Sequence, residues 1–172
     1  MADLTFNTTP GSVAERKLMI LYLNTGTLES PTWSAVGKRV EDSSMEMDWG
    51  EETKKDIFGI TYTTMSTPTI TQTFDPCELD GADAAQVKLW NLAIKEQNPS
   101  ALANLDMLVA HLYAGAAATP FAERYHSCAV KPSGLGGSSN IGMPIDVTFG
   151  GTRAVGTASN SGGAVTFTED AA

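Results

Sequence analysis

The sequence predicts a mainly β fold with one helix, arranged as a β-sandwich or barrel of about eight strands. Short segments rich in β-branched and aromatic residues recur along the chain, separated by clusters of Gly, Pro, Asn and Ser. Only the segment after Gly81 has apolar residues at helical spacing. At 172 residues the chain is long enough for one domain with a full core. We expect that domain over residues 17–172.

Residues 1–16 contain Thr, Asn, Pro and Gly with little periodicity, which is typical of an extended N-terminal arm. Arms of this kind reach neighbouring subunits in assemblies, and a frayed terminus is the alternative interpretation. The polar start from Met1 to Pro10 does not have the pattern of a signal peptide. No apolar run is as long as a membrane span, so we expect none.

The composition limits the function classes. Charged residues make up 18% of the chain, and 20 acidic residues against 11 basic ones give a net charge of -9. Affinity for nucleic acid comes largely from Lys and Arg contacts to phosphates, so this balance argues against a DNA-gripping protein. The low charged fraction suits a chain that buries much of its surface against copies of itself. Cys77 and Cys128 are too few for a disulfide framework, and we expect free thiols.

A dense acidic segment runs from Glu41 to Asp56, with seven acidic residues against two basic ones. Within it, apolar and acidic residues alternate over Met45–Trp49, which is the period of a strand with one solvated face. Gly50 ends that strand, and the β-branched and aromatic run 57–64 favours a second one, which continues through residues 66–73 toward Phe74. The pattern predicts a hairpin whose charged part, residues 41–56, projects from the domain.

Further strands are expected at 18–23, 33–36, 107–113, 123–131, 145–149, 153–157 and 165–168. In the segment 66–74, Thr occurs at nearly every second position and Pro68 marks an edge, a bulge or a break between strands. An exposed edge of this length invites uncontrolled pairing unless something covers it. A neighbouring subunit would cover it in a ring.

The helix is expected from near Ala82 to Gln97, capped by Asp80 or Asp83 and stopped by Asn98-Pro99. A short helical turn is expected to follow over residues 100–104. The spacing predicts a core-facing stripe made by Val87, Trp90 and Ile94.

The segment WSAVGKRVEDSSMEMDWGEETKKDIFG at residues 33–59 resembles a signature of the major tail (tail tube) proteins of long-tailed bacteriophages and related prophage tail-like particles. The resemblance continues in the Phe74-Asp75-Pro76 turn, in the helix, in the GMPIDV run at 142–147, and in the closing segments 156–157 and 165–168. It spans residues 17–170 and keeps the order of the elements.

The resemblance implies a structural protein that is not an enzyme and needs no cofactor. Such chains form hexameric rings, each closed by an inter-subunit sheet, that stack into a hollow tube in the virion tail. Phage DNA passes through the tube into the host without specific binding. The implied partners are other copies, the tape measure protein, and the tail terminator and distal tail proteins, with assembly in the host bacterial cytoplasm.

Two alternatives accompany this prediction. One is the inner tube of a contractile tail, a tail-like bacteriocin or a secretion machine. The other, from a different class, is a monomeric β-sandwich binding module. In either tube, apolar residues in an otherwise charged loop are expected to make subunit or ring contacts. The candidate interface residues are Glu41, Asp42, Met45, Met47, Asp48, Trp49, Glu51, Glu52, Lys54 and Lys55.

Other motifs carry little chemistry. His126 and Cys128 share one face of a strand, and with Cys77 and His111 they include the residue types of a zinc site, but the spacing has no zinc pattern. The same residues offer a Cys128–His111 nucleophile pair, which any chain with two of each type would offer. The glycine-rich run 134–137 lacks the Gly-Lys-Ser/Thr ending of a phosphate loop. We expect no catalytic, metal or cofactor site.

Overall fold

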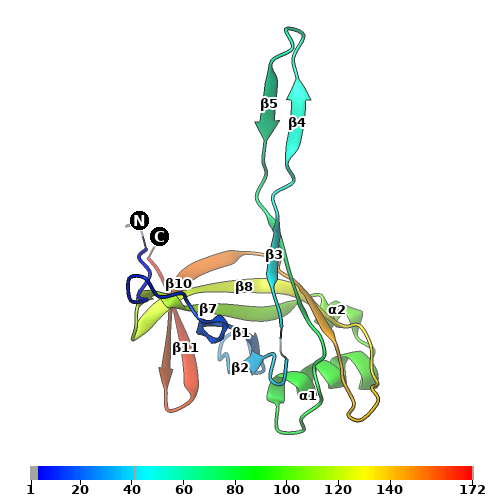
Figure 1. Cartoon of the computed structure of the whole chain (residues 1–172). Coiled ribbons are helices and arrows are strands. Elements are labelled where there is room, and N and C mark those ends of the chain that lie inside the picture. Colours follow the sequence, from blue (N-terminus) through cyan, green and yellow to red (C-terminus); the bar gives the residue numbers. More distant parts are fainter. Residues whose placement is uncertain (1–3, 41, 172) are drawn as a thin grey trace.

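The computed structural model describes residues 4–40 and 42–171 and contains eleven strands, one principal helix and a few short helical turns (Figure 1). The strands are β1 (Met19–Asn24), β2 (Trp33–Val36), β3 (Met45–Asp48), β4 (Glu52–Lys55), β5 (Thr61–Thr64), β6 (Thr69–Phe74), β7 (Leu105–Ala116), β8 (Thr119–Pro132), β9 (Ile145–Thr148), β10 (Arg153–Ser161) and β11 (Ala164–Glu169). The helical elements are a 3-10 turn (Arg16–Leu18), α1 (Ala84–Trp90), a π turn (Asn91–Lys95) and α2 (Pro99–Leu102).

Nine of these strands form one curled sheet, and β4 and β5 pair separately. The long strand β8 connects its two parts, because its first half pairs with β7 and β10 while its last residues, 129–132, pair with β9. On one side the order is β2-β1-β7-β8-β10-β11, and on the other β8-β9-β6-β3. All described pairings are antiparallel. The predicted fold class, mainly β with one helix, is confirmed.

The central strands are buried on both faces, which explains their continuous apolar sequences. In β1, Leu21 and Leu23 belong to the main core beneath α1, whereas Tyr22 between them belongs to a second cluster on the opposite face. The same alternation places Met107 of β7 in the main core and Leu108 in the second cluster. The β10–β11 end of the sheet adds Ala158, Val165 and Phe167 to that second cluster.

The helix begins as expected, because the Asp83 carboxylate accepts hydrogen bonds from the backbone N–H groups of Ala85 and Gln86. The predicted core-facing stripe is wrong in two of its three positions. Val87 and Ile94 are 43% and 40% exposed, and only Trp90 packs partly against the core. The buried face is made instead by Ala85, Leu89 and Leu92. These lie at i, i+4 and i+7, an equally helical spacing that the sequence could not rank above the other.

The strand β3 pairs with β6, with Met47 opposite Ile70, so the predicted second strand of the hairpin, running toward Phe74, is the partner over its 69–72 part. The 57–64 run contributes β5, whose partner is β4, Glu52–Lys55. The charged stretch expected to be a connection therefore contains a strand itself, which raises the strand number above eight. The break at Pro68 falls between β5 and β6, one of the options that the sequence left open.

The N-terminal arm is described from residue 4, and its residues 5–7 lie along the end of β7. Phe6 forms a bridge with Ala114, and the Asn7 side chain donates to the carbonyls of Leu112 and Gly115. Phe6 also packs edge-on against Tyr113, with ring centroids 5.5 Å apart. Residues 1–3 lie outside the described part. No helix in the described residues is long and apolar enough to span a membrane.

Candidate assembly surface

A long hairpin, residues 45–74, rises from the body of the molecule and is its most prominent feature (Figure 1). We call it the projecting hairpin. Its base is β3 and β6, and β6 is tied to the sheet through β9. Its outer part is the β4–β5 pair, where no second layer covers either face (Figure 1). An isolated two-stranded ribbon is marginally stable in water, so this part of the molecule would be strengthened by a partner.

The tip of the hairpin, residues 56–60, is a compact turn built around one carboxylate. The Oδ1 atom of Asp56 accepts hydrogen bonds from the backbone N–H groups of Phe58 and Ile60, both at 2.9 Å. The Asp56 carbonyl accepts a third from Gly59, at 3.0 Å. Gly59 has a φ of +78°, which a residue without a side chain adopts easily. The turn therefore holds its side chains in a fixed arrangement.

The tip exposes large apolar side chains. Ile57, Phe58 and Ile60 are 94%, 82% and 63% exposed, and Tyr62 and Met65 add further apolar surface along β5 and just beyond it. The composition of this run predicts a strand, and the candidate interface residues do not include it. The sequence did carry a signal for it, an Asp-x-x-Gly turn flanked by apolar residues. Clustered exposed apolar groups mark surfaces that bind other macromolecules.

The predicted interface residues divide into separate groups. Met47, Asp48, Trp49, Glu51, Glu52, Lys54 and Lys55 lie on the projecting hairpin and are all exposed. Met45 lies at the base and packs against the main core. Asp42 lines a shallow depression on the body with Ser43 and Gln72, and Glu41 lies outside the described residues. The structure thus brings together the 47–55 residues, with the tip, and separates Asp42 and Met45 from them.

Charges on the hairpin are solvated. Glu52 and Lys54 form an ion pair of 2.8 Å with both side chains more than half exposed, and such pairs contribute little to stability. Asp48 accepts a hydrogen bond from the backbone N–H of Gly50 and so shapes the bend between the two parts of the hairpin. The charges keep the stem in water, while the apolar tip is what a partner would bury.

A groove of about 460 Å³ lies where the hairpin meets the body. We call it the basal groove. Its walls are mostly apolar; the lining residues are Met47, Trp49, Thr67, Pro68, Ile70, Glu123, Tyr125, Phe149, Gly150, Gly151 and Arg153. Tyr125 and Phe149 pack with their ring centroids 5.0 Å apart.

A partly buried polar cluster, centred on Glu123, lines part of the basal groove. Glu123 accepts hydrogen bonds from Arg153 Nε at 2.5 Å and from the Tyr125 hydroxyl at 2.8 Å, and it lies 2.8 Å from Nε2 of His111. Burial raises the pKa of this carboxyl, but the hydrogen bonds from His111, Arg153 and Tyr125 outweigh it and lower the pKa to about 2. His111 also contacts the Tyr113 hydroxyl beneath the N-terminal arm.

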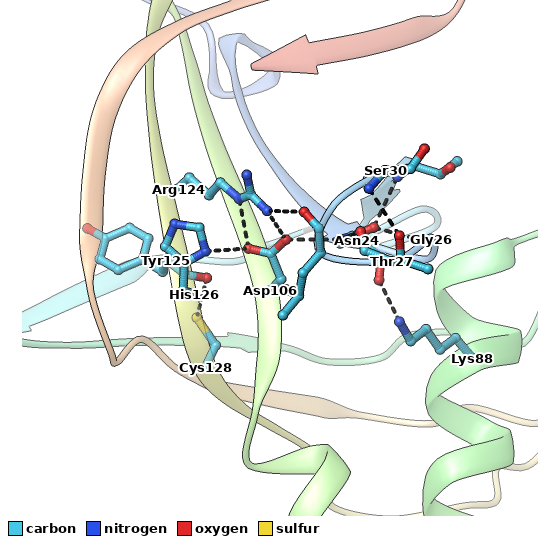
Figure 2. A network of polar contacts seen from close by, with 12 residues as sticks. Asn24, Gly26, Thr27, Ser30, Lys88, Asp106, Arg124, Tyr125, His126 and Cys128 are labelled. Atoms are coloured by element: carbon cyan, nitrogen blue, oxygen red, sulfur yellow. Dashed lines mark hydrogen bonds and ion pairs between the residues drawn. The ribbon is translucent and has the colours of Figure 1, made fainter. Parts of the chain in front are cut away.

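A second polar network, centred on Asp106, joins several elements of the body (Figure 2). Asp106 at the start of β7 accepts two hydrogen bonds from Arg124, at 3.0 and 2.8 Å, and one from the Asn24 amide at 2.9 Å. His126 Nδ1 lies 3.6 Å from the same carboxylate. Lys88 of α1 donates to the Asn24 carbonyl at 2.7 Å, and burial lowers its pKa while Asp106 opposes that shift. The network joins α1, the loop after β1, β7 and β8.

The residues considered for metal or nucleophile chemistry do not meet. His111 contacts Glu123 and Tyr113, whereas His126 faces Asp106. Both cysteine thiols are free and buried, and burial raises the pKa of Cys128 to about 12, so its reactive thiolate is disfavoured. Within residues 4–40 and 42–171, no cluster of three His, Cys, Asp or Glu side chains has the geometry to hold a metal ion.

Comparison with known proteins gives structural similarity only. No family model matches the chain, and no curated protein matches it. It is similar to a chain of an extracellular contractile injection system, solved as "PVC sheath-tube complex in extended state", with 7% identity and a TM-score of 0.48, covering 86% of this chain and 94% of that chain.

Two further solved structures are similar. The "anti-feeding prophage cap (AFP tube terminating cap)" is 15% identical with a TM-score of 0.47, covering 88% of this chain and 96% of that one. The "PVC sheath/tube terminator in extended state" is 9% identical with a TM-score of 0.47, covering 86% and 99%. At identities and TM-scores this low, no property of those proteins is carried over to this chain.

Proposed function

We infer that this chain is a structural subunit of a self-assembling tail tube, in a phage tail or a phage-derived tail-like particle. The observation that carries the proposal is the projecting hairpin. It holds Ile57, Phe58 and Ile60 in water at the end of a charged stem, where they contribute nothing to the chain's own core. A monomeric binding module would not need this surface to fold, and many identical copies could bury it in one another. The sequence resemblance to major tail proteins points to the same role.

In the proposed assembly, six copies form a ring and rings stack into a tube. Subunits meet through a heterologous contact, one sheet edge against a different edge of the next copy, so that the rotation closes. The short strand β2 lies at one edge of the curled sheet and β3 at another, and both present backbone groups for such pairing. The predicted interface residues on the hairpin, 47–55, contribute contacts between subunits or between stacked rings.

The first experiment tests assembly. The purified chain should elute as rings or larger species at high concentration and show hollow tubes with six-fold rings in negative stain. Monomers at all concentrations, with no higher species, would contradict the proposal and favour the monomeric binding module.

A matched variant tests the hairpin. Replacing residues 50–67 by an Asn-Gly turn keeps the β3–β6 ladder and removes the outer part. We expect a folded monomer with the parent's thermal unfolding profile and no tubes. Normal tubes from this variant would show that the hairpin is not an assembly element.

Two kinds of tube fit this proposal. The sequence resemblance implies a non-contractile long tail, whereas the similar solved structures come from contractile injection systems and the anti-feeding prophage. A sheath gene beside the gene for this chain, or a sheath around the isolated particles, would identify the contractile kind. The expected partners in a phage tail are the tape measure, terminator and distal tail proteins.

If the tube conducts a genome, its wall must let a polyanion slide. The chain has 20 acidic residues against 11 basic ones, and an acidic or neutral lining keeps DNA away from the wall by a weak repulsion that salt screens within about 8 Å at physiological ionic strength. We expect a net negative lumen and no measurable affinity for duplex DNA at roughly 150 mM salt. Tight DNA binding by isolated rings in an anisotropy titration would contradict this part of the proposal.

A further inference from the structure

We propose that the apolar tip of the projecting hairpin inserts into the basal groove of a second copy of this chain. The inference rests on the proposed self-assembly and adds to it the acceptor site and the pairing of residues. Ile57, Phe58 and Ile60 form the inserted part, and the groove lies between the hairpin base and the body.

The chain cannot fill its own groove with its own tip. Met47, at the groove, and Phe58, at the tip, lie eleven positions apart along the stem, which can span up to about 36 Å at roughly 3.3 Å per residue. The stem points away from the body (Figure 1). The tip turn is fixed by its Asp56 hydrogen bonds, so the apolar side chains cannot fold back locally. Both halves of the contact are therefore open in a single chain.

The two surfaces match in chemistry. The groove walls present Trp49, Ile70 and Phe149 to an apolar insert, and the volume of about 460 Å³ is in the range that accepts several side chains. The outer hairpin carries three acidic residues against Lys54 and Lys55, and Glu52 already pairs with Lys54. Arg153 in the groove is itself paired with Glu123. The match between tip and groove is therefore apolar rather than ionic.

The area of one contact indicates how it would work. Burying an aromatic side chain such as Phe58 removes roughly 150–250 Å² from water, and a stable pair of proteins buries about 1,200–2,000 Å² in total. One tip in one groove is too small to hold two copies alone. Repeated around a ring, where every copy gives a tip and accepts one, the contacts reinforce one another. The contact is heterologous, and it places the bodies of consecutive copies about 36 Å apart along the stem.

Cysteine cross-linking tests the pairing directly. Phe58→Cys and Thr67→Cys are placed together in one chain; both positions are exposed, and Thr67 lines the groove. The two positions lie nine apart in the chain, at opposite ends of the stem, so a disulfide within one chain is excluded because its Cα atoms must lie within about 7 Å. We expect a ladder of covalent oligomers under mild oxidation. The control pairs Phe58→Cys with Leu135→Cys, an exposed residue outside the groove, and should give no ladder above background.

Truncation provides the second measurement. Phe58→Ala should raise the concentration needed for tube formation at least about tenfold, the loss expected when an aromatic anchor is removed. Ile141→Ala, at an apolar residue outside the hairpin that is 57% exposed, should leave that concentration unchanged. Both side chains are exposed, so neither change should alter the unfolding of the monomer.

The outcomes separate this inference from the proposed function. If the parent chain forms tubes but the Phe58–Thr67 cysteine pair cross-links no better than its control, the groove is not the acceptor and the tube role stands. Tubes from Phe58→Ala at the parent's concentration would likewise overturn the insertion. A parent chain that never assembles would overturn both.

Discussion

Removing the Asp106 carboxylate gives the sharpest test of what holds the body together. Asp106 is buried, with 3% of its side chain exposed, and it accepts both hydrogen bonds of the Arg124 fork and one from Asn24 (Figure 2). In Asp106→Ala, the Arg124 guanidinium stays largely buried without its counter-charge. Breaking a buried ion pair from one side costs about 3–5 kcal/mol.

The expected loss lies at the lower end of that range. The Arg124 side chain keeps 16% exposure, still reaches the Leu28 carbonyl at 3.2 Å, and stacks over the Trp33 ring at 5.4 Å. Asn24 keeps its hydrogen bond to the Thr27 carbonyl. We therefore expect Asp106→Ala to lower the free energy of unfolding by about 3 kcal/mol.

The assay is urea unfolding, followed by tryptophan fluorescence and circular dichroism at a concentration where light scattering shows no assembly. The control replaces both partners, Asp106→Leu with Arg124→Met, because a buried pair exchanged for apolar groups costs little. We expect the double variant to recover about 2 kcal/mol relative to the sum of the single losses. A loss below about 1 kcal/mol for Asp106→Ala, or strict additivity in the double variant, would refute this account of the network.

Further predictions concern pH, the core and the hairpin. The folded pKa of Glu123 is about 2, below its ordinary value of 4.5. The stability that the ionised carboxylate adds to the fold is therefore complete above pH 4.5 and is lost as the pH falls towards 2. Glu123→Gln should remove up to about 3 kcal/mol of that acid dependence in pH-dependent urea melts. Leu89→Ala, at a fully buried position, should lower the free energy of unfolding by about 2–5 kcal/mol, and Ile94→Ala, at a half-exposed position, by less than about 1 kcal/mol in the same urea unfolding. Equal losses would mean that the predicted face, which includes Ile94, packs against the core after all. Trp49→Ala should give slower and shorter tubes in light scattering and negative stain without changing the unfolding of the monomer, and tubes of parent length would argue against an anchor there.

The sequence by itself determined the local features. The alternation in β3 and the β-branched composition of β5 and β6 gave strands at those places, and the Asp83 cap gave the start of α1. These succeed because they depend on residues close in the chain, such as a carboxylate accepting from N–H groups two and three residues ahead. The charge pattern likewise showed that the acidic segment lies in water.

The tertiary structure decided which elements meet. Two helix faces have equivalent spacing, and only the position of α1 on the sheet selects Leu89 over Val87 and Ile94. Strand pairing is equally non-local: β3 joins β6 because β6 is anchored to β9 in the body, which leaves β4 and β5 to each other.

The candidate assembly surface likewise has a part that the sequence predicted and a part that only the folded chain reveals. Its acidic stem could be found from the sequence, whereas the tip looked like strand because apolar β-branched residues favour strands wherever they occur. Exposure distinguishes them, and exposure is a property of the folded chain. The basal groove joins side chains more than a hundred residues apart, Met47 and Arg153 among them. No local pattern encodes such a meeting, because packing of the whole sheet brings those residues together.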